Sequence, residues 1–250
     1  MPLPEMIPHL LATSDVLGTG WFAADAANVR SGMTVAVVGD GAVGPMGILS
    51  VKQKGAERIL AMSRHEKRQK LALEFGATGI LAQLGDEDVA RVKELTKGVS
   101  TDALLECVGT QQSMHQAVRS ARPDGFVSLV GVPHEMTLTG EELFWSMVHS
   151  YGDPTPVRRF LPNLIDLVWT GKIQPGKVLD LDFPLDRAAE GYGAMDERTA
   201  VERFHPSGIA ALSTEKFGAA VEHLDRYKQL TVPEEIQPHM GDEEWTLRFR

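Results

Sequence analysis

The residues with the clearest capacity for chemistry lie between Gly39 and Gly44, in the stretch GDGAVG of this 250-residue sequence. They follow an apolar run typical of a buried strand and precede a helical segment, which is the context in which this glycine spacing binds phosphates. Gly39 permits a tight turn, Gly41 lets the backbone approach a pyrophosphate, and Gly44 allows close packing of helix on strand. Backbone N–H groups and the helix dipole would hold the phosphates. The alternative is a glycine-rich turn that binds nothing, and we expect the dinucleotide site.

A second group of residues bears on which dinucleotide binds. A site for NAD usually has an Asp or Glu about 20 residues past the loop, where it accepts from the ribose 2′-hydroxyl. Here the next strand ends in Ser63 and Arg64, no carboxylate precedes Glu66, and Lys67 and Arg68 follow. A hydroxyl next to a guanidinium suits a 2′-phosphate, whereas the alternative is a solvated basic helix start, which the helix dipole opposes. We therefore expect NADP rather than NAD.

The elements that must position these groups alternate between strands and helices from residue 31 to about 132. TVAVV is a continuous apolar run, as in a parallel strand covered on both faces. Strand–helix alternation predicts an α/β, Rossmann-type, doubly wound parallel sheet with right-handed crossovers. The predicted strands are 34–38, 57–62, 77–82, 103–107 and 126–132, and the predicted helices are 44–54, 65–75 (with Gly76 as its C-cap), 86–96 and 112–121.

The flanks are less regular, and we divide the chain into four parts. Residues 1–30 form a lead-in with a helix over 11–30, residues 31–152 the nucleotide-binding domain, and residues 153–200 further helices and a strand. Residues 201–250 are an extension that either folds over exposed surface or does not fold. Within these parts we expect helices over 141–149, 156–170 and 185–198, a strand over 177–183, and helical spacing from 217 to 227.

Composition limits the class of protein. A net charge of −9 without a basic stripe argues against binding nucleic acid, and no apolar run is long enough to cross a membrane. The N-terminus lacks the basic region of a signal peptide. Cys107 is the only cysteine, which excludes an internal disulfide or a cysteine-cluster zinc site. We expect a protein of the cytoplasm, and we expect Cys107 to pack rather than react.

Several segments together resemble the zinc-dependent alcohol dehydrogenases of the medium-chain dehydrogenase/reductase superfamily, over about residues 8–200. In that family a GroES-like catalytic domain accompanies the nucleotide-binding domain. The segments that carry the resemblance are SDVLGTGW (14–21), TVAVVGDGAVG (34–44), GAERILAMSR (55–64), EFGAT (74–78), ECVG (106–109), GFVSLVGVP (125–133), DPTPVRRFLPNLIDLVWTGKI (153–173) and AAEGYGAMDER (188–198).

The resemblance implies roles for individual residues. Gly39, Gly41, Ala42, Val43 and Gly44 would hold the pyrophosphate, and Ser63 and Arg64 would line the adenosine ribose. Thr19 would face the nicotinamide end, and two further segments would border the nicotinamide ribose and ring. These segments are Cys107, Val108 and Gly109, and Val130, Gly131 and Val132.

Zinc ligands are where the sequence departs from the family. Asp15 falls at the position of the third protein ligand of the catalytic zinc, but the family's catalytic Cys, the His-Glu pair and the four-Cys lobe have no counterparts. Catalytic zinc needs about three protein ligands, and the eight histidines show no ligand spacing. We therefore favour a role for Asp15 in starting a helix.

Three functions follow as hypotheses. The first is an oxidoreductase that passes hydride between an alcohol or aldehyde and the nicotinamide, with zinc and a proton relay that come from another chain or are replaced. The second is a catalytically silent dinucleotide-binding module, and the third is a truncated relic. By resemblance, and because twofold pairing is the commonest assembly, we also expect a homodimer formed through the sheet edge after residue 147.

Overall fold

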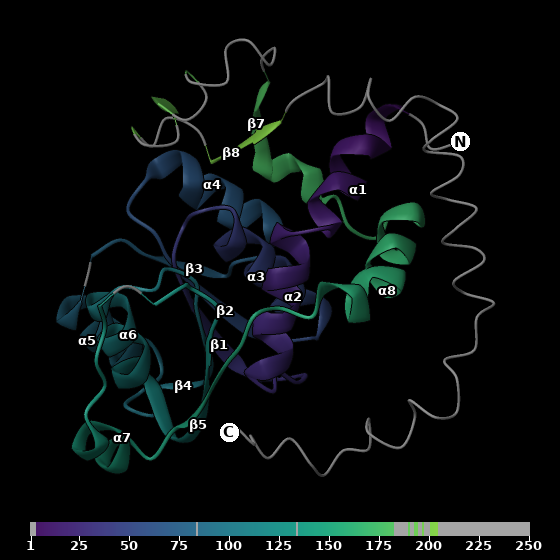
Figure 1. Cartoon of the computed structure of the whole chain (residues 1–250). Helices are drawn as coiled ribbons and strands as arrows, with labels where there is room; N and C mark the ends of the chain where they lie inside the picture. The colour runs from purple at the N-terminus through teal and green to yellow at the C-terminus, as the bar shows by residue number, and fades with distance from the viewer. Residues whose placement is uncertain are drawn as a thin grey trace, which may run out of the picture. The chain divides into compact units, whose positions relative to one another are not determined.

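A computed structural model describes residues 4–83, 85–133, 135–182, 190, 193–194, 197 and 201–204. Its centre is a six-stranded sheet in the order β3-β2-β1-β4-β5-β6, and every neighbouring pair is parallel (Figure 1). The order reverses between β1 and β4, so that the chain winds in two directions from that point. This is the doubly wound Rossmann-type arrangement that the strand–helix alternation predicts. The six strands are β1 (Thr34–Val38), β2 (Arg58–Met62), β3 (Gly79–Leu81), β4 (Thr101–Glu106), β5 (Ala121–Leu129) and β6 (His149–Gly152).

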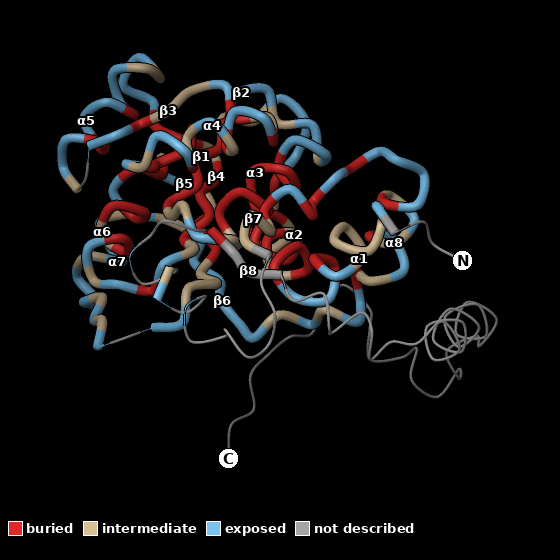
Figure 2. The backbone as a smooth tube through the Cα atoms, turned by 90° about the horizontal axis from the view of Figure 1, so that it is seen from above, coloured by how far each residue is buried: buried red, intermediate tan, exposed pale blue. Residues whose placement is uncertain are grey.

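Two apolar cores lie on opposite faces of the sheet, because successive side chains of a strand point to opposite faces. Val35 and Val37 of β1 belong to one core, and Ala36 and Val38 belong to the other. All four side chains are at most 5% exposed, and the central strands form the buried middle of the molecule (Figure 2). The sheet is therefore covered on both faces, which explains the uninterrupted apolar run TVAVV.

Helices pack on both faces of this sheet. On one face α2 packs on α3 so closely that a Cβ on Gly20 would lie 2.5 Å from the backbone of Gly47. Gly76 ends α4 in the left-handed conformation, with φ of 114°, as expected from its position. The helices are η1 (Pro4–Met6), α1 (Ile7–Thr13), α2 (Val16–Ala26), α3 (Val43–Gln53), α4 (Glu66–Phe75), α5 (Asp86–Leu95), α6 (Gln111–Ser120), α7 (Gly140–Ser146) and α8 (Val157–Trp169).

The strands expected over 126–132 and 177–183 are found at 121–129 and 179–182, and two predicted helices differ further from the structure. The helix expected over 11–30 is two helices, because Asp15 has φ of −145° and ψ of −86°, outside the helical region. The helix expected over 141–149 ends earlier, since Met147 is left-handed with φ of 51°. His149 then begins β6, where it pairs with Phe126 of β5. Pairing with a distant strand, which local periodicity does not contain, determines the second difference.

The last described segments form a small second sheet. After η2 (Pro175–Val178), strand β7 (Leu179–Asp182) pairs in parallel with β8 (Glu202–Phe204). Regular structure thus continues a few residues into the part that we had assigned to the extension. Most of the helix expected over 185–198, and all of residues 205–250, lie outside the described residues. No helix in the part described is both long enough and apolar enough to span a membrane.

Candidate functional site

Four loops converge at the carboxyl edge of the sheet. Because β1, β2, β4 and β5 are parallel, the segments that follow them emerge at the same edge. Ligands of open α/β sheets bind at this edge, where the strand order reverses. The reversal lies between β1 and β4. The four segments are 39–44, 63–65, 107–109 and 130–132, and they hold all but two of the site residues predicted from the sequence.

The glycine loop has no room for side chains at two of its three glycines. Gly39 has φ of 115°, and a Cβ on it would lie 2.8 Å from the Val108 side chain. A Cβ on Gly44 would lie 1.9 Å from the carbonyl oxygen of Gly39. Gly41 is different, because a Cβ there would meet nothing within 4 Å. Space beside its backbone is what a pyrophosphate requires.

The helix that follows the loop has no side-chain cap. Ala42 occupies the N-cap of α3 and makes no side-chain hydrogen bond there. The first N–H groups of a helix have no partner within the helix, and the positive end of the helix dipole adds to their attraction for anions. Gly41, Ala42, Val43 and Gly44 therefore combine open space with N–H groups that can bind a phosphate.

Asp40 joins the glycine loop to the end of β2. Its Oδ2 accepts a hydrogen bond from the Ser63 hydroxyl at 2.8 Å, and its Oδ1 accepts one from Arg68 Nη1 at 3.1 Å. Ser63 and Arg68 are 5% and 7% exposed. Burial on its own would raise the pKa of Asp40, but Ser63 and the Arg68 guanidinium outweigh it and hold the pKa below its ordinary value. The carboxylate is thus ionised at neutral pH.

Arg64 differs from the other basic residues of this region. Lys67 forms an ion pair with Asp180 at 2.5 Å, and Arg68 pairs with Asp40. Arg64 is exposed at the end of β2 and makes no hydrogen bond or ion pair within the described part of the chain. It is the cation of this group that is most available to a ligand.

Glu106 organises the two loops at the other end of the site. Its Oε1 accepts hydrogen bonds from the N–H groups of Val108 and Gly109, and its main-chain oxygen accepts from Val130 and Gly131. The residue is fully buried. Gly131 approaches so closely that a Cβ on it would lie 2.2 Å from the nitrogen of Gly109. The segments 107–109 and 130–132 therefore lie in contact, with Val108 and Val132 exposed at the surface.

Cys107 lies within this group but is poorly suited to react. Burial, and then the negative charge of Glu106, raise the pKa of its thiol far above the ordinary value. The thiolate is the reactive form of cysteine. The half-buried Cys107, directly after β4, therefore fits the packing role expected from the sequence.

The two remaining predicted residues lie on or before α2. Thr19 is half-buried on α2 next to Gly20, through which this helix contacts α3, and its side chain makes no hydrogen bond in the described structure. Asp15 is exposed at the N-cap of α2, without a side-chain capping bond. Asp15 thus occupies the N-cap position of α2, but its side chain does not cap the helix. The described residues contain no group of three or more His, Cys, Asp or Glu that could hold a metal ion.

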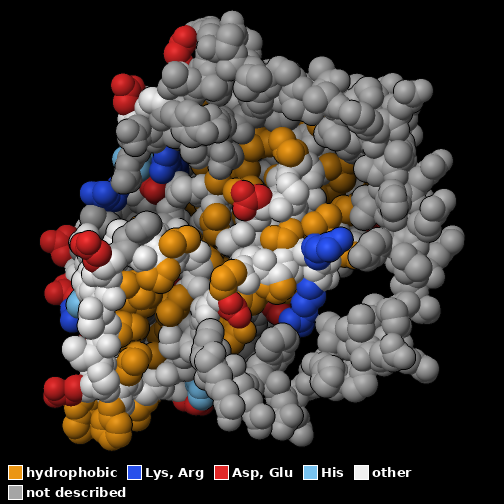
Figure 3. All heavy atoms as spheres, in the orientation of Figure 1, with side chains coloured by type: hydrophobic (Ala, Val, Ile, Leu, Met, Phe, Trp, Pro, Cys, Tyr) orange, Lys and Arg blue, Asp and Glu red, His pale blue; other side chains and the backbone are white. Residues whose placement is uncertain are grey.

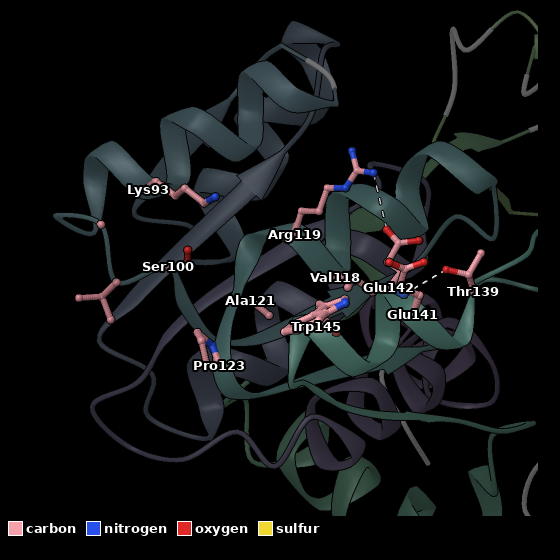
Figure 4. A pocket seen from close by; sticks show the side chains of 13 residues that line it. Lys93, Ser100, Val118, Arg119, Ala121, Pro123, Thr139, Glu141, Glu142 and Trp145 are labelled. Carbon is pink, nitrogen blue, oxygen red and sulfur yellow. Dashed lines mark hydrogen bonds and ion pairs between the residues drawn. The ribbon is translucent and has the colours of Figure 1, made fainter.

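Two hollows lie away from this edge. One, of about 690 Å³, is lined by residues from α5, α6 and α7 and from the beginning of β5 (Figure 4). Trp145 and the ion pair between Arg119 and Glu142 border it. The other, of about 510 Å³, includes Thr34 and Asp102 at the starts of β1 and β4. Both lie at amino ends of strands, at the edge of the sheet opposite to the glycine loop.

Sequence reasoning missed two residues of the site, Asp40 and Glu106. Both are carboxylates inside the quoted motifs GDGAVG and ECVG. An acidic residue next to a run of buried strand residues is the available signal for each, because a buried carboxylate needs hydrogen-bond donors.

Comparison with known proteins agrees with this arrangement. Residues 42–159 match the family model of zinc-binding dehydrogenases. A probable zinc-binding alcohol dehydrogenase of Mycobacterium tuberculosis is 33% identical over 207 residues, which are 81% of this chain and 53% of that protein. An NADP-dependent isopropanol dehydrogenase of Entamoeba histolytica is 31% identical over 176 residues, covering 68% of this chain and 48% of that protein. The solved alcohol dehydrogenase of Thermus sp. ATN1 has 28% identity and a TM-score of 0.72, over 78% of this chain and 56% of that one.

Fold and site together define a Rossmann-type nucleotide-binding domain. The chain belongs to the zinc-type alcohol dehydrogenase family of the medium-chain dehydrogenases and corresponds to the nucleotide-binding part of its members. It spans about half the length of the curated relatives that it matches.

Proposed function

We propose that this chain binds a nicotinamide dinucleotide, NADP in preference to NAD, at the carboxyl edge of its sheet. The observation that carries the proposal is the contrast within the glycine loop. Gly44 is in contact with the backbone of Gly39, whereas the space beside Gly41 is open. Tight backbone packing with one open approach is what the pyrophosphate of a dinucleotide requires.

The remaining residues fit the rest of such a ligand. Residues 39–44 would hold the pyrophosphate through backbone N–H groups. Ser63 and Arg64 would lie at the adenosine ribose, and the segments 107–109 and 130–132, with Thr19, would border the nicotinamide. When bound, the nicotinamide supplies or accepts the hydride; the part of this chain is to orient the ring.

The glycine loop provides the test. Gly41→Ala should leave the thermal unfolding temperature nearly unchanged, because a Cβ there meets no protein atom within 4 Å. The same methyl group would obstruct the pyrophosphate, so the affinity for NADPH should fall at least about tenfold, the equivalent of about 1.4 kcal/mol. Fluorescence titration with NADPH measures the affinity.

Gly140→Ala is the matched control. Gly140 lies at the start of a helix, α7, as Gly41 lies just before α3, and a Cβ on Gly140 would also meet nothing within 4 Å. It should affect neither folding nor binding. Saturable NADPH binding by the wild-type chain that survives Gly41→Ala unchanged would contradict the proposed site, and absence of binding by the wild-type chain would contradict the function.

For the reaction, we propose hydride transfer between an alcohol or aldehyde and the nicotinamide, as in alcohol dehydrogenases. The described residues do not fit a catalytic zinc, since they contain no group of three or more possible ligands. We therefore propose that Asp15 begins a helix and is not a zinc ligand. The second candidate, a catalytically silent binding module, draws its support from the same observation.

Zinc content and turnover distinguish these two functions. Purified protein is assayed for zinc, and for NADPH-dependent reduction of simple aldehydes. Dinucleotide binding with neither zinc nor turnover supports the silent module, and stoichiometric zinc with turnover supports the oxidoreductase. We also propose that the protein is located in the cytoplasm.

We further propose that two copies pair through the β6 edge of the sheet. β6 ends the strand order, and all four of its residues are exposed. Three apolar side chains next to it, Phe144, Trp145 and Met147, are 72%, 71% and 61% exposed. Apolar side chains gather over α7 at the lower left of Figure 3. An exposed strand edge beside an apolar patch is typical of an interface.

Sedimentation velocity tests the pairing. The wild-type chain should sediment as a dimer, and Trp145→Lys should shift it toward the monomer. Trp169→Lys is the control, because Trp169 is another exposed tryptophan (50%) and belongs to α8 rather than to the segment before β6. A monomeric wild-type chain would remove this proposal.

A further inference from the structure

Asp40 places a negative charge at the point where a Rossmann site distinguishes its two dinucleotides. Val38 of β1 pairs with Met62 of β2, so the residues that follow these two strands are neighbours. The hydrogen bond between Ser63 and Asp40, at 2.8 Å, fixes this contact. In Rossmann sites the group that follows the second strand meets the ribose 2′-substituent.

The hydrogen bond also determines what Ser63 can offer to a ligand. A hydroxyl has one proton to donate, and in the structure Ser63 donates it to Asp40. Toward a ligand it therefore presents lone pairs, which can accept a hydrogen bond from a 2′-hydroxyl. A 2′-phosphate carries acceptor oxygens and negative charge, so it finds neither a donor in Ser63 nor an attractive neighbour in Asp40.

Asp40 and Arg64 therefore act in opposite directions. The exposed guanidinium of Arg64 attracts a 2′-phosphate, whereas the carboxylate of Asp40 repels it. We propose that Asp40 is a specificity residue that limits the preference for NADP, so that the chain binds both dinucleotides with a modest difference. This inference rests on the proposed dinucleotide function and refines it.

The two oxygens of Asp40 have different partners, because Arg68 pairs with Oδ1 and Ser63 contacts Oδ2. Arg68 donates from a side chain that is 8% exposed, while the Asp40 side chain itself is 16% exposed. Glu66, the next carboxylate along the chain, pairs with Lys70 at 2.8 Å and is exposed to solvent. Asp40 is therefore the carboxylate that contacts Ser63 directly, in a place where solvent screens its charge less than at the surface.

The experiment measures dissociation constants for NADPH and NADH with the wild-type chain and with Asp40→Asn. The affinity ratio should shift about tenfold toward NADPH, because the variant removes a negative charge next to the 2′-phosphate. The shift should shrink as salt is added. Adenosine 2′,5′-bisphosphate, compared with AMP, repeats the measurement without the nicotinamide half.

Asp102→Asn is the matched control. Asp102 also accepts from an arginine, Arg122 Nε at 2.8 Å, but it contacts Thr34 at the opposite end of β1. The ratio of NADPH to NADH affinity in this variant should stay within about twofold of the wild-type value. Asp40→Ser, a second neutral variant that retains a hydroxyl for Ser63, carries the test if Asp40→Asn does not fold.

The outcomes separate the inference from the function beneath it. A wild-type chain that binds either dinucleotide, with a ratio that neutral variants at position 40 leave unchanged or shift toward NADH, overturns the inference alone. An equal loss of affinity for both dinucleotides in these variants would make Asp40 a structural residue, and it would overturn the inference as well. A wild-type chain that binds neither dinucleotide overturns the proposed function, and the inference with it.

Discussion

The carboxylate of Glu106 accepts a hydrogen bond from the backbone N–H of Gly109 at 2.8 Å, only three residues further along the chain. A second bond from Val108 N–H, at 2.9 Å, reaches the same oxygen. The main-chain oxygen of Glu106 meanwhile accepts from Val130 and Gly131, at 3.0 and 3.2 Å. One buried residue thus fixes the loops after β4 and β5 relative to each other.

Glu106→Ala should lower the free energy of unfolding by about 2–4 kcal/mol, because it leaves buried N–H groups without an acceptor. Urea denaturation measures the change. Glu106→Gln keeps an oxygen in place and should cost less. Glu94→Ala, which removes an exposed carboxylate from α5, should alter the stability by no more than about 0.5 kcal/mol. Equal stability of the Ala variant and the wild-type chain would show that these bonds do not hold the loops.

Arg64→Ala should weaken NADPH binding about tenfold and NADH binding by less than about twofold, since charge-assisted contacts with a phosphate are among the stronger hydrogen bonds. Isothermal titration with both dinucleotides measures the difference. The control is Arg58→Ala, at the other end of β2, where the guanidinium donates to the carbonyl oxygen of Leu95. Equal weakening of both dinucleotides would contradict a role for Arg64 at the 2′-phosphate.

Cys107 should react slowly with thiol reagents in the folded chain. Burial and Glu106 raise the pKa of its thiol, so the thiolate fraction at pH 8 is very small. Because Cys107 is the only cysteine, the absorbance change with a disulfide reagent reports on it alone. The native rate should be at least about a hundredfold below the rate in urea, and similar rates would contradict the burial of this thiol.

Titration of Asp88 should make the stability of the folded chain depend on pH. It is fully buried, and desolvation raises its pKa although Gln116 donates a hydrogen bond to it at 3.1 Å. The folded state therefore binds this proton more tightly than the unfolded state. Its stabilising contribution is complete below the unfolded pKa, near 3.9, and is lost as the pH rises through the folded value.

Asp88→Asn should accordingly raise the thermal unfolding temperature at pH 7–8, and the difference from the wild-type chain should diminish toward pH 4. Differential scanning calorimetry across this range checks it. Asp86→Asn, which changes an exposed carboxylate in the same first turn of α5, should show no such gain at neutral pH. A constant difference across the range would exclude titration of Asp88 as its source.

Where local sequence determines structure, prediction succeeds. The apolar run at 34–38 and the glycine spacing 39–44 place β1, the loop and α3 within a residue or two of their observed bounds, because burial and backbone conformation are set by those residues themselves. The left-handed Gly76 is another such case. The same applies to the carboxyl-edge position of the predicted site residues, since parallel strands bring their following loops together.

Where distant residues decide, prediction fails. His149 belongs to a strand only because β5 offers an edge to it, and a helical pattern in 141–149 does not contain that information. Lys67 and Arg68 follow the predicted site residues Ser63 and Arg64 directly in the sequence, but in the structure Arg68 contacts Asp40 of another loop. Contacts across 28 positions of the sequence depend on the folded arrangement, which residue types alone do not specify.

The contact between His9 and Gly176 has a wider consequence. The Gly176 N–H donates to His9 Nδ1 at 2.9 Å, across 167 positions of the sequence. The segment before the sheet, at His9, and the segment after it, at Gly176, are therefore hydrogen-bonded to each other. A folding unit whose entry and exit adjoin can be inserted into, exchanged between or circularly rearranged within longer polypeptides while its strand order is preserved. Modularity of this kind allows one nucleotide-binding unit to be combined with different partner domains in evolution.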